Sequence, residues 1–158
     1  MTVGIKHFKQ WYLKGNRLEK KQSSIKNCFV SLAIGDGLVL TGSERNTLMS
    51  WKGTDATPIA LSAWKGGQPP ESKKVKELVD SSLSSVIDAI TIQQNFVAAG
   101  CKNHLIFILN KQDLKNILNI INLEEDVQLA SMCSSVRALD FADSGSRMLV
   151  GTLASEIY

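Results

Sequence analysis

Three glycines each close a short run of apolar residues, and this repeated pattern constrains the fold more than any other feature of the chain. Gly42, Gly100 and Gly151 follow such runs, at spacings of 58 and 51 residues. A second apolar run begins five or six residues after each glycine, and another apolar run precedes each of them. Self-similarity at this spacing indicates a repeat architecture built from small β-sheets.

The remaining apolar runs are mostly four to eight residues long and are bounded by glycine, asparagine, aspartate or serine, as strands usually are. A small sheet with two apolar faces cannot bury itself alone, so copies are expected to stack face to face around an axis. The predicted strands are Ile5–Leu13, Cys28–Ala33, Leu38–Thr41, Thr47–Trp51, Pro58–Ala63, Val86–Ile92, Phe96–Ala99, Leu105–Leu109, Ile117–Ile121, Val136–Phe141, Met148–Val150 and Glu156–Tyr158. The sequence therefore predicts an all-β fold of WD-repeat-like β-propeller blades.

Residues 1–158 are expected to form one partial propeller, with about two full blades flanked by partial blades in an incomplete ring. In each blade the glycine is expected to permit the tight turn between the middle strands. Tryptophans at nearly the same place after their glycines are expected to fill the space between blades. The predicted structural anchors are Gly4, Trp11, Gly42, Trp51, Gly100 and Gly151.

A polar, lysine-bearing insertion at residues 68–83 interrupts the strand pattern. Pro69-Pro70 excludes regular strand pairing at its start. The insertion is expected to be an exposed loop, which is either a plain solvated linker or a basic contact for an acidic partner. The candidate partner-binding residues are Lys65, Lys73, Lys74 and Lys76.

Composition excludes several classes of protein. The formal net charge of +3 is too small to indicate a nucleic-acid-binding protein, and no stretch approaches the 18 apolar residues of a membrane-spanning helix. The chain begins without the apolar region of a secretory signal. Three widely spaced cysteines and two histidines form no metal-ligand spacing and no disulfide framework, so no metal and no cofactor is expected.

One motif favours a different class of protein. An apolar strand followed by Asn110-Lys111-Gln112-Asp113 is similar to the guanine-recognition segment of GTP-binding proteins. The phosphate-binding loop that such proteins need is missing, so a polar turn after a blade strand is the favoured interpretation. Cys101 with His104 is a weak candidate for a nucleophile pair, and the acidic run Glu124–Asp126 is interpreted as a solvated loop. No enzyme is predicted.

Three segments resemble the echinoderm microtubule-associated protein-like family, which has atypical WD repeats. They are Thr2–Trp11 followed by Gly15-Asn16, Phe29–Gly42 followed by Leu48–Gly53, and Val136–Ile157 with its Leu149-Val150-Gly151-Thr152 strand. The order and spacing of these segments match the family over almost the whole chain. The chain departs from the family at Ala63-Trp64-Lys65-Gly66, where the family often has a histidine.

The resemblance implies a non-catalytic cytoskeletal protein of the cytoplasm that binds tubulin or microtubules. The alternative is a generic WD-repeat scaffold for other protein complexes, and GTP binding is the remote alternative. Closed propellers use at least about four blades, so the chain is either a fragment or has its open blade edges capped, for example by self-association. Neither a nucleic acid nor a membrane is an expected partner.

Overall fold

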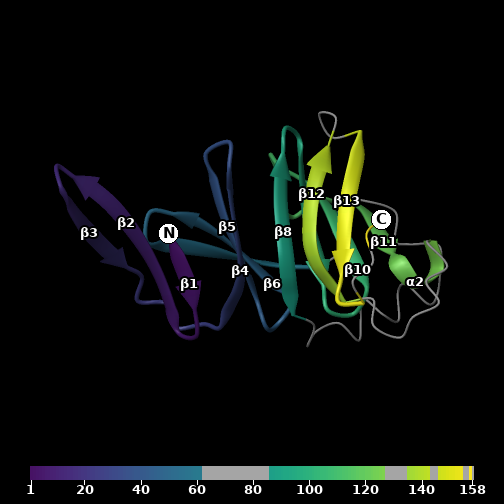
Figure 1. Ribbon diagram of the computed structural model, residues 1–158, viewed down its shortest axis with the longest axis horizontal. Helices are drawn as coiled ribbons and strands as arrows, with labels where there is room; N and C mark the ends of the chain where they lie inside the picture. Colours follow the sequence, from purple (N-terminus) through teal and green to yellow (C-terminus); the bar gives the residue numbers. More distant parts are fainter. Residues whose placement is uncertain (62–85, 127–134, 143–145, 155–156, 158) are drawn as a thin grey trace.

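The computed structural model describes residues 1–61, 86–126, 135–142, 146–154 and 157. Figure 1 shows these residues as a series of small antiparallel sheets that lie side by side in chain order. The insertion at residues 68–83, together with Lys65, Lys73, Lys74 and Lys76, lies outside the described residues.

Four sheets, which we call blades 1 to 4, make up the described structure. Blade 1 contains β1 (Thr2–Gly4), β2 (His7–Lys14) and β3 (Arg17–Gln22). Blade 2 contains β4 (Phe29–Gly35), β5 (Leu38–Ser43), β6 (Thr47–Lys52) and β7 (Asp55–Ala60). Blade 3 contains β8 (Ile87–Gln93), β9 (Phe96–Cys101), β10 (Leu105–Asn110) and β11 (Ile117–Asn122). Blade 4 contains β12 (Val136–Ala142) and β13 (Arg147–Thr152).

Each blade is a meander in which consecutive strands pair antiparallel. Blades 2 and 3 have four strands each, whereas blades 1 and 4 have three and two in the described ranges. Strand β8 of blade 3 packs against β4 of blade 2 on one side and against β12 of blade 4 on the other. The ring is not closed, and the predicted all-β fold with two full blades and flanking partial blades is confirmed.

Several segments differ from the predicted elements. The predicted strand Ile5–Leu13 is interrupted by the β1–β2 turn at Lys6, whose φ angle is 59°, so β2 begins at His7. Strand β3 was not expected, because Arg17–Gln22 is polar and all six of its residues are exposed. This segment is a strand because it pairs with β2, where Leu18 lies opposite Leu13. Hydrophobic alternation within the segment does not indicate it. The acidic run Glu124–Asp126, predicted as a loop, forms the last three residues of the one-turn helix α2 (Leu123–Asp126). The Asn122 side-chain oxygen accepts a hydrogen bond from the Glu124 N–H at 3.2 Å at the start of this helix.

The largest core lies between blades 2 and 3. Leu40 and Leu48 of blade 2 are fully buried with Val97 and Phe107 of blade 3 in one cluster. A second cluster joins blade 3 to blade 4 through Ala98, Ile106 and Val136. The joints between blades, rather than the single sheets, therefore hold most of the buried apolar surface.

The predicted anchor glycines lie inside strands and not in the turns. The turns between the middle strands are made at Asn46 and His104, which adopt positive φ angles of 50° and 69°. A Cβ atom added to Gly42 would lie 2.7 Å from the Ile87 Cβ of blade 3. A Cβ atom on Gly100 would lie 2.4 Å from Val136 Cγ1 of blade 4. Glycine is therefore required at these two positions because the next blade approaches closely, which corrects the expected turn role.

The other two anchor glycines have different surroundings. A Cβ on Gly4 would lie 2.7 Å from the His7 Cε1 atom, so this glycine makes room for a side chain of its own blade. A Cβ on Gly151 would meet its nearest atom, the Ala138 Cβ of its own blade, at 3.4 Å. Among the described residues, no further blade approaches Gly151.

The two predicted tryptophan anchors also differ from each other. Trp51 is buried between blades, and its indole lies parallel to the Phe8 ring of blade 1, with centroids 3.6 Å apart and planes within 4°. Trp11 is 41% exposed, and its indole N–H donates to Thr2 Oγ1 within blade 1 at 3.2 Å. The expected filling role between blades is therefore seen at Trp51 and not at Trp11, because no described blade precedes blade 1.

Candidate interaction surface

A basic groove lies where blades 1 and 2 meet. Its volume is about 460 Å³, and it forms at the turn between β1 and β2, the connection from β3 to β4, and the turn between β5 and β6. We call it the basic groove, and its lining residues are Ile5, Lys6, Lys26, Asn27, Cys28, Glu44 and Arg45. Concave sites of this size with converging polar groups are the usual places where proteins bind ligands or partner segments.

The backbone of the basic groove is held from both sides. The Lys6 N–H donates to the Asn27 carbonyl oxygen at 2.9 Å, and Ile5 forms an isolated antiparallel bridge with Cys28. From blade 2, the Glu44 N–H donates to the Cys28 carbonyl oxygen at 3.3 Å. The connection at residues 26–28 is therefore fixed between two blades, and its side chains are presented by an ordered backbone.

The side chains of the basic groove carry a positive balance. Lys6, Lys26 and Arg45 are exposed, and Glu44 is the acidic residue in the lining. Lys6 has a φ angle of 59°, so the β1–β2 turn reverses sharply at this lysine. Three cations around one groove attract an anionic segment, and in an exposed setting this attraction acts mainly on the association rate and on selectivity.

Cys28 is the nucleophilic side chain in the basic groove, and its surroundings keep it protonated. A hydrogen bond to Glu44 raises the pKa of the Cys28 thiol, and burial and the negative charge of Glu44 raise the pKa further. Since the thiolate is the reactive form of cysteine, these surroundings disfavour nucleophilic chemistry.

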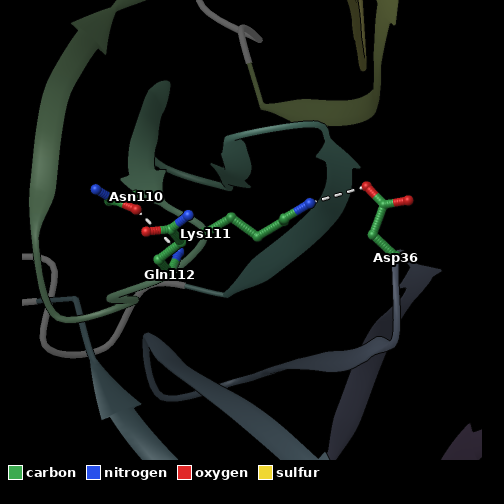
Figure 2. Close-up of polar contacts among 4 residues, drawn as sticks. All are labelled: Asp36, Asn110, Lys111 and Gln112. Atoms are coloured by element: carbon green, nitrogen blue, oxygen red, sulfur yellow. Dashed lines mark hydrogen bonds and ion pairs between the residues drawn. The ribbon is translucent and has the colours of Figure 1, made fainter.

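The guanine-recognition candidate is occupied by contacts within the protein (Figure 2). The Asn110 side-chain oxygen accepts a hydrogen bond from the Gln112 N–H at 2.9 Å. Lys111 reaches away from that turn and pairs with Asp36 of the β4–β5 turn at 2.9 Å. The Asp113 carboxylate accepts a hydrogen bond from the Lys115 N–H at 3.2 Å. These groups stabilise a turn and link blade 3 to blade 2.

The other chemical candidates do not come together. Cys101 is buried with its sulfur 3.7 Å from Asn46 Oδ1, whereas His104 Nε2 lies 3.3 Å from Glu124 Oε1. The two side chains of the weak nucleophile pair therefore have separate partners. The described part of the chain holds no cluster of three or more residues with metal-ligand chemistry. It also has no helix of the length and apolar character needed to span a membrane.

The sequence shows a basic cluster at Lys6, Lys9, Lys14, Arg17, Lys20 and Lys21, which includes one cation of the basic groove. Lys26 and Arg45, the other two cations of the groove, lie outside this cluster. The three residues are far apart in the sequence and approach one another only because blade 1 stacks on blade 2. The other basic residues of that cluster, Lys9, Lys14, Arg17, Lys20 and Lys21, lie on β2 and β3 or in their connection. A turn at Lys6 would have indicated that this lysine leaves the strand and approaches blade 2. The sequence does not indicate that turn, because lysine is not a typical residue for a positive φ angle.

Comparisons with known proteins show the fold. No family model and no curated protein matches the chain. The chain is similar to the crystal structure of the computationally designed Ika4 protein, with a TM-score of 0.57 and 16% identity over 97% of this chain and 78% of that one. It is also similar to the β-propeller domain of Cps50 (Swd1) from Myceliophteria thermophila, with a TM-score of 0.52 and 13% identity over 84% of this chain.

The chain spans 38% of the length of the Swd1 chain that it matches. At these identities the likeness shows the fold alone, which is that of propeller blades. The comparisons support the propeller-like part of the sequence resemblance, and they give no support to the echinoderm microtubule-associated protein-like family or to tubulin binding.

Proposed function

We propose that this chain is a non-catalytic protein-interaction module that binds an acidic segment of a partner protein in the basic groove. The observation that carries the proposal is the convergence of Lys6, Lys26 and Arg45 around one groove of about 460 Å³. Their positions depend on the joint between blades 1 and 2, so the charge pattern belongs to the folded chain and not to a flexible tail.

The architecture supports a binding role. Stacked blades form a rigid scaffold, and loops presented by a rigid scaffold commonly carry recognition. The raised pKa of Cys28 removes the nucleophile that the basic groove would otherwise offer. Binding through charge and shape needs neither a metal nor a cofactor.

Tubulin is the specific acidic partner that the sequence resemblance suggests, with a cytoplasmic and cytoskeletal location as the consequence. A generic scaffold that binds another acidic protein is the second candidate. The positive balance of the basic groove fits both partners, so binding experiments must distinguish them.

The first experiment measures binding of the full chain to microtubules by co-sedimentation and to poly-glutamate by fluorescence anisotropy, over a range of salt concentrations. The triple variant Lys6→Glu/Lys26→Glu/Arg45→Glu is expected to weaken both interactions by roughly tenfold or more and to flatten the salt dependence. The matched control is the triple variant Lys52→Glu/Lys102→Glu/Lys115→Glu, which changes the net charge equally, because these three lysines are exposed and lie outside the basic groove.

Each outcome separates the candidates. Binding to poly-glutamate without pelleting on microtubules selects the generic scaffold and removes tubulin. Equal losses in the groove variant and in the matched triple variant would show that total charge, and not the basic groove, drives binding. Charge reversal at Lys73, Lys74 and Lys76 tests the sequence-based prediction that the insertion contributes to partner binding. Unchanged affinity would favour the alternative interpretation, in which the insertion is a solvated linker.

A further inference from the structure

The outer face of blade 4 is an apolar surface that none of the described residues covers. It holds a shallow depression of about 240 Å³, lined by Ala138, Leu139, Asp140, Leu149, Gly151 and Ile157. Leu149 is 50% exposed and Ile157 is 79% exposed. The opposite face of the same sheet is covered, because Val136 and Val150 are buried against blade 3.

The outer face of blade 1 is a second uncovered surface. Side chains on a strand alternate between faces, so Phe8 and Gln10 point toward blade 2 while Trp11 and Leu13 point away from it. Leu18 pairs directly with Leu13 and shares that outer face. The exposed fractions are 41% for Trp11, 75% for Leu13 and 67% for Leu18.

The joints inside the chain show how such faces are covered. At the joints between blades 2 and 3 and between blades 3 and 4, a glycine of the earlier blade receives a β-branched residue of the later blade, Ile87 on Gly42 and Val136 on Gly100. At the first two joints, an aromatic residue from the third strand of the later blade packs on the earlier blade. Trp51 stacks on Phe8 of blade 1, and Phe107 is buried with Leu40 and Leu48 of blade 2.

Together, the two outer faces carry the two sides of a joint like those inside the chain: blade 4 has the glycine side and blade 1 has the aromatic side. Gly151 corresponds to Gly42 and Gly100, but no described blade approaches it. Trp11 lies on β2 and points away from blade 2, just as Trp51 of β6 points away from blade 3 and onto Phe8 of blade 1. Trp11 therefore occupies the position of the joint aromatic without an earlier blade beneath it.

We propose that a second copy of this chain completes the joint, with the Trp11 face of one copy docked on the Gly151 face of the other. The two faces lie at opposite ends of the row of blades, so a single chain does not bring them together (Figure 1). Both faces present exposed apolar side chains, Trp11, Leu13 and Leu18 on one and Leu149 and Ile157 on the other. A head-to-tail contact that closes after two copies forms this joint twice.

The first measurement is the mass of the full chain in solution by sedimentation equilibrium over a range of concentrations. The expected result is a reversible rise from 17.3 kDa toward twice that value. A mass that stays at 17.3 kDa at every concentration overturns the proposal and assigns the two faces to other occupants.

The second measurement uses one variant on each face. Gly151→Ala has room in the single chain, because its nearest neighbour is the Ala138 Cβ at 3.4 Å. In the proposed joint, the same Cβ meets the close approach seen at Gly42 and Gly100, so association is expected to fall at least tenfold, while the melting temperature measured at concentrations where both chains are monomeric stays unchanged. Trp11→Glu is expected to weaken association equally, since it places a charge at the centre of the joint.

Mixing the two variants tests the head-to-tail geometry. Each variant alone has no intact joint, whereas the mixture has one, between the Trp11 face of the Gly151→Ala chain and the Gly151 face of the Trp11→Glu chain. Association is therefore expected to return in part when the variants are mixed. Association that persists in both single variants, or that fails to return in the mixture, overturns the proposed joint.

Discussion

The Ser31 hydroxyl of blade 2 donates a hydrogen bond to the main-chain carbonyl oxygen of Ile87 of blade 3 at 2.6 Å, across 56 residues of sequence. The bond is buried beside Gly42, whose missing side chain allows the two strands to approach. The Ser31 side chain thus satisfies a buried backbone acceptor in the neighbouring blade. The joint therefore contains a directional hydrogen bond in addition to its buried apolar surface.

Ser31→Ala removes this donor. The variant is expected to lower the free energy of unfolding by about 1–2 kcal/mol, because the buried Ile87 carbonyl loses a partner. Urea denaturation measures the change. Ser24→Ala, at an exposed serine between blades 1 and 2, is the matched control and is expected to cause little change.

Gly100→Ala places a methyl group 2.4 Å from Val136 Cγ1. The variant is expected to destabilise the chain by about 1–3 kcal/mol through overpacking of the joint between blades 3 and 4. Gly151→Ala, measured at a concentration where the chain is monomeric, is the matched control, since its Cβ is accommodated at 3.4 Å. Equal melting temperatures for the two variants would contradict the close approach at Gly100.

Phe8→Ala removes the ring that stacks on Trp51 and leaves a cavity at the joint between blades 1 and 2. Because Phe8 is fully buried, the expected cost is about 3–5 kcal/mol. Trp51 fluorescence would report the loss of the stack in a chain whose other tryptophans are replaced by phenylalanine. Tyr12→Ala, on the exposed part of the same strand, is expected to cost much less.

The pair of Lys111 and Asp36 links blades 2 and 3 at 2.9 Å, but the Asp36 side chain is 57% exposed. Solvent screening therefore limits its contribution to about 0–1 kcal/mol. A double-mutant cycle with Lys111→Met and Asp36→Asn measures the coupling energy, which is expected to fall as sodium chloride is added. A coupling that does not change with salt would show that the link is not electrostatic.

Cys28 is expected to react slowly with iodoacetamide at slightly alkaline pH, because Glu44 and burial raise the thiol pKa. Glu44→Gln removes the carboxylate, lowers the pKa and is expected to speed alkylation, as followed by peptide mass mapping. The direction in which stability changes with pH follows from the same pKa shift of Cys28. The raised pKa stabilises the fold below the unfolded-state pKa, and this stabilisation is lost as pH rises through the folded-state pKa. Glu19→Gln, a change remote from Cys28, serves as the control.

The spacing of the apolar runs and glycines was enough to predict blades, their number and most of their strands. Hydrophobic alternation is a local property, so it marked β4 to β6 and β8 to β11 directly. It did not mark β3, because Arg17–Gln22 has no buried face and is ordered by its pairing with β2. The sequence motif Asn110–Asp113, which resembles a guanine-recognition segment, forms turn contacts and an ion pair within the protein.

Tertiary structure alone decided which residues meet across a joint. The glycine pattern was visible in the sequence, but only the stacking of blades showed that Gly42 and Gly100 admit a neighbouring strand while Gly151 faces outward. The basic groove likewise joins Lys6, Lys26 and Arg45 from three connections. Local sequence patterns encode strands because side-chain periodicity acts within a few residues, whereas contacts between blades depend on packing between segments that are tens of residues apart.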